Sequence, residues 1–178
     1  MSTAVTPQDL RRAFGLFATG VTVVTAVSPK GEPVGITANS VTSVSLDPPL
    51  LLWCLASRST SIPAFVPGAA FAVHVLAGHQ AEVALHFARL GGSKFEVDAF
   101  WRTCPTPPEI AEAVACFACR VDSVFPGGDH QIIVGRVVDV ATRELPPLVF
   151  QGSRFGSFER QVGSDLIDVW GESYDAWM

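Results

Sequence analysis

Short apolar or β-branched segments, separated by turns rich in proline and glycine, fill most of the sequence from residue 21 onward. Many short strands at close spacing, with few helices between them, are typical of a β-barrel. The segment 50–56 is apolar on both faces, so we expect it to be a buried central strand. The other expected strands cover 21–27, 34–38, 41–46, 71–76, 115–125, 131–141 and 148–151.

Two helices are expected beside these strands. Thr6 is suited to cap a helix that starts at Pro7, Asp9 lies in its first turn, and Gly20 is expected to end it. A second helix is expected over 80–90. Its apolar face carries Val83, Ala84, Phe87 and Ala88.

Composition narrows the function classes. Hydrophobic residues make up 48% of the 178 residues and charged residues 16%, which excludes a disordered chain and indicates that a second copy covers part of the surface. The net charge of −5, without a basic cluster, argues against nucleic-acid binding. No apolar run is long enough to span a bilayer, and residues 1–9 lack a signal-peptide core, so we expect a cytoplasmic protein that does not contact membranes.

The four cysteines are expected to be free thiols in a reducing compartment. Cys116 and Cys119 form a CxxC pair, but no second pair or paired histidine follows to complete a zinc site. The pair also lies in a predicted strand. We therefore interpret both cysteines as small buried residues and expect no metal site.

Four polar segments could carry chemistry. Hydroxyl and amide side chains are dense over 37–45, and consecutive polar residues at Asn39 and Ser40 predict a bend. The loop 57–61 follows the strand 50–56 and offers four hydroxyls and Arg58, which suits a phosphate group. The simpler alternative is a helix-capping surface loop in which Ser61 caps the segment 62–65. Lys94 and Phe95 lie in a glycine-rich loop. His130 follows a predicted turn at 127–129 that does not itself require a histidine.

Taken together, these segments resemble the flavin reductase-like family, the short reductase components of two-component flavin monooxygenases. The resemblance runs from about Arg11 to Phe158, and residues 161–178 form a separate tail outside it. The stretches that carry it are FATGVTVVTA, PVGITANSVTSVSLDPPLLLWCLASRSTS, FAVHVLAGHQAEVALHFA, KFE, GGDHQIIVGRV and PLVFQGSRFG.

The resemblance implies a six-stranded antiparallel Greek-key split β-barrel, over 1–160, with flanking helices in a homodimer. It places flavin phosphate near Ser59, Thr60 and Ser61 with help from Lys94, and His130 on the nicotinamide side. The family often has tyrosine where Phe155 stands, so a hydroxyl role is lost there while ring stacking remains. The implied cofactor-binding residues are Thr37, Ala38, Asn39, Ser40, Cys54, Ala56, Ser57, Ser59, Thr60, Ser61, Phe87, Lys94 and Phe155.

The implied activity is hydride transfer from NADH or NADPH to FMN or FAD, which supplies reduced flavin to a separate oxygenase component. Positioning provides most of the catalysis in such a reaction, because the cofactors carry the chemistry. An alternative is a flavin-binding relay or sensor that does not turn over free flavin. A split-barrel oxidase of a phosphorylated vitamin would need several more arginines at a second phosphate pocket.

Overall fold

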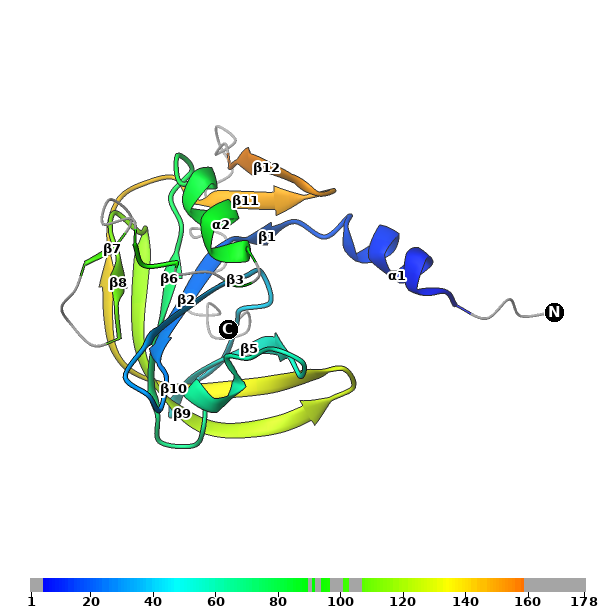
Figure 1. Ribbon diagram of the computed structural model, residues 1–178. Coiled ribbons are helices and arrows are strands. Elements are labelled where there is room, and N and C mark those ends of the chain that lie inside the picture. The colour runs from blue at the N-terminus through cyan, green and yellow to red at the C-terminus, as the bar shows by residue number, and fades with distance from the viewer. Residues whose placement is uncertain (1–4, 90, 92–93, 97–100, 103–106, 159–178) are drawn as a thin grey trace.

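The structure, a computed structural model, describes residues 5–89, 91, 94–96, 101–102 and 107–158. Cys104 and the predicted tail 161–178 lie outside the described residues. The described elements are two α-helices, a 3-10 helix and twelve strands, so the expectation of a mainly β fold is confirmed (Figure 1). In chain order they are α1 (Pro7–Phe14), β1 (Thr19–Gly20), β2 (Thr22–Val27), β3 (Pro33–Ala38), β4 (Thr42–Leu46), β5 (Pro49–Ala56), η1 (Ile62–Ala64), β6 (Ala70–Val75), α2 (Ala81–Ala88), β7 (Trp101–Arg102), β8 (Glu109–Ile110), β9 (Ala115–Gly127), β10 (His130–Thr142), β11 (Leu148–Gln151) and β12 (Arg154–Ser157).

The largest sheet contains seven antiparallel strands in the order β3-β2-β6-β9-β10-β5-β4. Antiparallel pairing was expected, but the strand count differs from the six implied by the resemblance. Two smaller sheets, β1-β11-β12 and β7-β8, complete the described fold. Sequence reasoning missed β1, β7, β8 and β12, because strands of two to four residues show too little alternation to be recognised.

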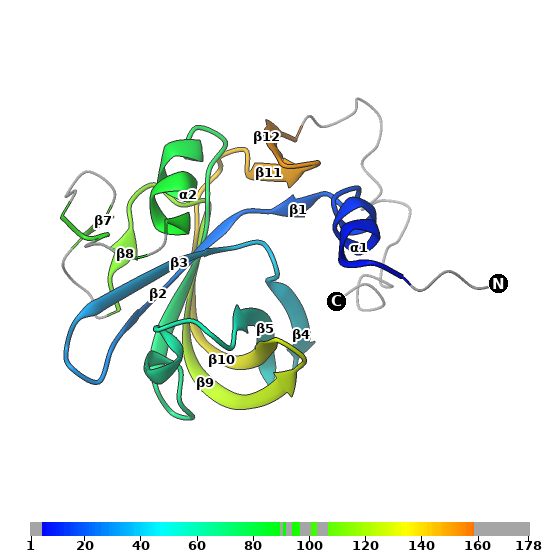
Figure 2. The same ribbon diagram turned by 45° about the vertical axis from the view of Figure 1, so that its right-hand side comes forward.

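The large sheet curls strongly. Its two edge strands, β3 and β4, are consecutive in the chain and are joined only by residues 39–41. Four residue steps from Ala38 to Thr42 span at most about 14 Å, so the two edges approach each other at this end. Figures 1 and 2 show β9 and β10 bending across the sheet to allow this approach. The curl brings the end of β3 beside β5, as a contact between Ser40 and Cys54 confirms.

Two apolar clusters stabilise the chain. Inside the curled sheet, the Trp53 ring centroid lies 4.9 Å from that of Phe65, which in turn lies 6.0 Å from that of Phe71. The second cluster lies under α2, where the fully buried Phe87 packs 5.3 Å from Phe95. Strand β2 contributes to both clusters, since Val24 belongs to the first and Val23 to the second.

Strand β5 differs from the expectation of burial on both faces. Leu51, Trp53 and Leu55 are buried, whereas Leu52 and Cys54 on the opposite face are only half-buried. The neighbouring β4 exposes Val44 and Leu46 on the surface. The strand is central, as predicted, with β10 on one side and β4 on the other. Its second apolar face is covered incompletely in the single chain.

Helix α1 begins as predicted and ends early. The Thr6 hydroxyl accepts from the Asp9 amide, and the Asp9 carboxylate accepts from the Thr6 amide, which completes a capping box. The helix ends at Phe14 with Gly15 as its C-cap, and Gly20, the expected end, lies in β1 instead. No residue of α1 is buried, and the helix extends away from the sheet in both ribbon views. Neither α-helix in the described ranges is long and apolar enough to cross a membrane.

Candidate functional site

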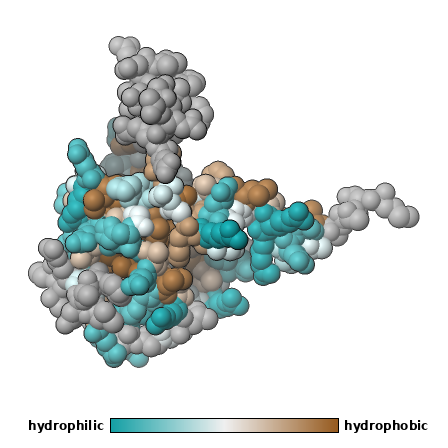
Figure 3. All heavy atoms as spheres, turned by 90° about the horizontal axis from the view of Figure 1, so that it is seen from above, coloured by the Kyte–Doolittle hydropathy of each residue, from teal (hydrophilic) through white to brown (hydrophobic). Residues whose placement is uncertain are grey.

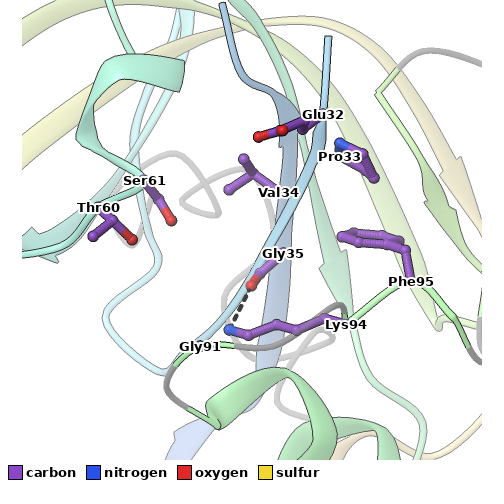
Figure 4. A pocket seen from close by; sticks show the side chains of 9 residues that line it. All are labelled: Glu32, Pro33, Val34, Gly35, Thr60, Ser61, Gly91, Lys94 and Phe95. Atoms are coloured by element: carbon purple, nitrogen blue, oxygen red, sulfur yellow. Dashed lines mark hydrogen bonds between the residues drawn. The ribbon is translucent and has the colours of Figure 1, made fainter. Parts of the chain in front are cut away.

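A cavity of about 410 Å³ opens between β3, the loop after β5 and the loop after α2 (Figure 4). Its volume falls within the range of small-molecule sites. Three residues that the sequence singled out, Thr60, Ser61 and Lys94, meet at this cavity although they come from distant parts of the chain. The complete lining is Glu32, Pro33, Val34, Gly35, Thr60, Ser61, Gly91, Lys94 and Phe95.

Lys94 has a fixed ammonium group at the cavity wall. Its Nζ donates to the Gly35 carbonyl at 3.0 Å and to the Phe87 carbonyl at 2.8 Å. Partial burial lowers the pKa of Lys94, because desolvation disfavours the charged form. An ammonium has three N–H donors, so one donor remains for a ligand. The two carbonyls therefore act as a brace that aims a positive charge at the cavity.

The hydroxyls of Thr60 and Ser61 lie across the cavity from Lys94 (Figure 4). A turn places them, since the Ser59 amide donates to the Ala56 carbonyl and the Ser59 hydroxyl accepts from the Ser61 amide at 3.2 Å. Ser61 was expected to cap the following segment, but its side chain makes no capping bond to η1. Among the described residues neither the Thr60 nor the Ser61 hydroxyl has a hydrogen-bonding partner. A cation and two available hydroxyls form a donor set that suits a phosphate.

Gly35 allows β3, which forms one wall of the cavity, to pack directly against the ring of Phe87 in the core. A Cβ at this position would lie 2.5 Å from two ring carbons of Phe87, a separation that real side chains do not show. Strand β3 can therefore lie flat on the Phe87 ring only with glycine at residue 35. Sequence reasoning missed Gly35, although an isolated glycine inside a strand is a recognised sign of close backbone approach.

The polar side chains of segment 37–40 mainly make hydrogen bonds that hold the fold together. The Thr37 hydroxyl donates to the Ala84 carbonyl at 2.7 Å, which ties β3 to α2. The Ser40 hydroxyl accepts from the Cys54 amide at 3.0 Å. Asn39 is exposed in the predicted bend, and Ala38 is half-buried at the end of β3. Ser40 thus links this segment to β5, and none of the four residues lines the cavity.

His130 lies at the other side of β5. Its Cα pairs with Ala56 in the sheet, and the Ser57 amide donates to the Asp129 carbonyl at 2.9 Å. Its ring nitrogen Nδ1 lies 2.7 Å from the Asp129 carboxylate, which lowers the pKa of Asp129. Gly128, with φ of +69°, forms the left-handed turn that the histidine follows. Half of the imidazole is exposed, so the edge next to Ala56 and Ser57 has a group able to donate a hydrogen bond.

Phe87 and Phe155 are also absent from the lining of the cavity. Phe87 is fully buried, so only its backbone carbonyl acts there, by holding Lys94. Phe155 lies in β12, where its ring packs 5.6 Å from Phe150. Sequence reasoning also missed Glu32, Val34 and Gly91, because their types alone do not indicate a binding role.

The CxxC pair lies on β9 as expected. Burial raises the pKa of Cys119 to about 12 and that of Cys116 to about 11, so both remain protonated thiols at neutral pH. The described part of the chain holds no cluster of three or more His, Cys, Asp or Glu side chains that could bind a metal ion.

Comparisons with known proteins agree with this architecture. The FMN reductase (NADH) SmoA of Agrobacterium fabrum is 45% identical over 155 residues, which cover 86% of this chain and 87% of the relative. The NADH-dependent flavin reductase of a Rhodococcus species is 39% identical, over 94% of this chain and 93% of that protein. Among solved structures, the NADH:FAD oxidoreductase SgcE6 of Streptomyces globisporus, in complex with NAD and FAD fragments, superimposes with a TM-score of 0.81 at 38% identity, covering 90% of this chain and 99% of that one.

The model of a protein family, described as the flavin reductase like domain, matches residues 14–159, which include every residue of the cavity and of the β5 edge. This match and the relatives above show that the chain belongs to the flavin reductase-like family.

Proposed function

We propose that this protein is an NAD(P)H:flavin oxidoreductase that transfers a hydride to FMN or FAD and supplies reduced flavin to a separate monooxygenase component. The single observation that carries the proposal is the convergence of Lys94, Thr60 and Ser61 on one cavity, within a chain of the flavin reductase-like family. NADH is the preferred candidate for the donor, because the relatives compared above are named for it.

The residues present fit a flavin. The braced ammonium of Lys94 and the available hydroxyls of Thr60 and Ser61 would hold the phosphate, helped by Ser59 through the turn. The edge formed by Ala56 and Ser57, with Ser40 and Cys54 next to it, would run along the ring system. Bound flavin supplies the hydride-accepting chemistry, and the protein supplies position and shielding from water.

His130 would act on the nicotinamide side. It lies opposite Ala56, with its ring oriented by Asp129 and partly open to solvent. An imidazole fixed in this way can donate a hydrogen bond to the carboxamide and so help to align the hydride donor. It would be a positioning contact, since hydride transfer itself needs no acid–base pair.

Replacing His130 with alanine should therefore raise KM for NADH and lower kcat/KM about tenfold. This is the size of effect expected when one hydrogen bond, here the bond from the imidazole to the carboxamide, is lost. KM for flavin should stay near the wild-type value. Steady-state NADH oxidation checks this. His79→Ala, which removes an exposed histidine paired with Glu112, is the matched control. An unchanged kcat/KM in the His130 variant would remove the proposed role.

We further propose that two chains form a homodimer and that each curled sheet corresponds to the family's split barrel. The half-buried apolar face of β5 and the exposed Val44 and Leu46 of β4 support a partner surface. Apolar residues also reach the surface seen in Figure 3, and Phe14 at the end of α1 and Leu16 and Phe17 just after it are exposed. In a dimer, the ring of Phe155 would be available to stack on a flavin held by the partner chain. The free thiols in the described residues support a cytoplasmic location.

The experiment that tests the function is NADH oxidation as free flavin is added. A reductase of diffusible flavin shows a rate that rises and saturates with FMN or FAD concentration. The relay or sensor alternative predicts a rate that does not respond to added flavin. A flat response would therefore contradict the proposed function, and a saturable response would reject the alternative.

A further inference from the structure

Glu32 introduces a negative charge into a cavity whose other polar side chains, Lys94, Thr60 and Ser61, suit an anion. It is the last residue of the turn between β2 and β3, directly before Pro33, and its carboxylate faces the cavity with Thr60, Ser61 and Lys94 (Figure 4). Its backbone is held by Ser28, whose hydroxyl accepts from the Glu32 amide at 3.2 Å. Across the described ranges, the Glu32 carboxylate makes no ion pair or hydrogen bond. The exposed carboxylate is therefore not neutralised by another side chain of the described residues.

The cavity therefore has one cation and one anion among its lining residues. Lys94 is tied to two carbonyls and cannot swing toward Glu32 without breaking both bonds. A phosphate bound at Lys94, Thr60 and Ser61 would feel the Glu32 charge across the same cavity. The strength of that repulsion depends on the charge of the phosphate, which differs between the two flavin nucleotides.

From this geometry we infer that Glu32 is a specificity-determining residue, which disfavours the terminal phosphate dianion of FMN relative to the singly charged phosphate of the FAD diphosphate. The inference rests on the proposed function. A phosphomonoester has a second pKa of about 6 and carries nearly two charges above it, whereas each phosphate of FAD carries one. At the site formed by Lys94, Thr60 and Ser61, FMN places nearly two charges, and FAD, whose second charge lies on its next phosphate, places one. Because Coulomb energy is proportional to charge and falls with distance, the penalty from Glu32 at this site is about twice as large for FMN. The ribose hydroxyls of FAD can in addition donate to the carboxylate.

The test is equilibrium binding of FMN, FAD and riboflavin to Glu32→Gln and wild-type protein, measured by calorimetry without NADH. At pH 8 we expect the variant to bind FMN about fivefold more tightly and FAD about twofold more tightly, since halving the charge at the site takes the square root of the fold-change. Riboflavin, which has no phosphate, should bind both proteins equally. Glu144→Gln is the matched control, because it removes the same charge from an exposed residue outside the cavity.

A pH series separates the charge effect from a change in shape. As the pH falls from 8 to 5, FMN loses its second charge, so its fold-change should approach that of FAD. Among the lining residues, Lys94 and Glu32 are the charged groups that face the phosphate. His86 lies against the Lys94 carbonyl at 2.7 Å and is also titratable, but the ratio of variant to wild type at each pH removes its contribution.

Equal tightening of FMN and FAD at pH 8, or no tightening of FMN, would overturn the inference and leave the proposed function intact. Failure of the wild-type protein to bind any of the three flavins would overturn both. A fold-change for FMN that persists at pH 5 would also contradict the role of the second charge. Selective tightening of FMN at pH 8 that fades at pH 5 would support it.

Discussion

Lys94→Met should weaken the binding of FMN and FAD about 10- to 100-fold, because it removes a hydrogen bond from an ammonium to a phosphate, worth about 1.5–3 kcal/mol. Methionine keeps most of the apolar length of lysine but lacks the donors that hold the Gly35 and Phe87 carbonyls. Riboflavin should bind the variant with nearly the wild-type dissociation constant. Calorimetric titration with the three flavins measures both effects.

Riboflavin is the internal control for this prediction. If the variant lost its fold, all three flavins would weaken together, whereas loss of a phosphate contact spares riboflavin. Lys30→Met is the matched variant, since Lys30 is an exposed residue in the turn between β2 and β3 and lies outside the cavity. A variant that bound FMN as tightly as the wild type would show that Lys94 only braces β3 against α2.

Acidification from pH 7 to pH 4 should lower the free energy of unfolding by about 3 kcal/mol through His74 alone. This histidine is fully buried in β6, between Val23 of β2 and Cys116 of β9 in the sheet register. Its Nδ1 lies 3.1 Å from the Val23 carbonyl, and its buried Nε2 has no partner in the described part of the chain. Burial lowers the pKa of His74 to about 4, from 6.5 in an unfolded chain.

The direction in which the unfolding free energy changes with pH depends on whether the folded or the unfolded chain binds the proton. Between pH 6.5 and about 4 the unfolded chain protonates this histidine while the folded chain keeps it neutral. The stability contribution is therefore complete above pH 6.5, is lost as the pH falls toward 4, and does not change further below that. Urea denaturation at several pH values measures it.

His74→Asn is the informative variant, because asparagine keeps a donor for the Val23 carbonyl but cannot be protonated. Its unfolding free energy should depend less on pH than that of the wild type, by about 3 kcal/mol between pH 7 and pH 4. His79→Asn serves as the exposed control. An identical pH dependence in wild type and His74→Asn would contradict the assignment.

The strands were predictable from sequence wherever alternation or β-branching ran for five residues or more. Strands β2, β5, β9 and β10 lie within two residues of the expected segments. The end of α1 was not predictable in the same way. Phe17 continues the helical spacing of Leu10 and Phe14, but two tight turns after Ala13 lead the chain toward β11 instead. Pairing between β1 and β11, which joins Thr19 to Phe150 across 131 residues of sequence, is a tertiary effect that local pattern does not contain.

The residues of the site likewise divide into those that the sequence predicted and those that it did not. Resemblance to a family picked out Thr60, Ser61 and Lys94, and the fold brings these three to one cavity. It also picked out Phe87, whose ring packs directly against Gly35 of β3 and does not line the cavity. Glu32 was missed, because an isolated glutamate in a turn has no distinctive spacing. Whether such a residue faces a cavity depends on the curl of the whole sheet, which only coordinates reveal.

The most direct test of the account is a crystal structure of the protein with FMN. We predict that the phosphate lies between the loop 57–61 and β3, with its oxygens within about 3.2 Å of the Lys94 Nζ and of the Ser61 hydroxyl. A flavin whose phosphate lay elsewhere on the protein, with Lys94 still bound only to the carbonyls of Gly35 and Phe87, would contradict the central claim.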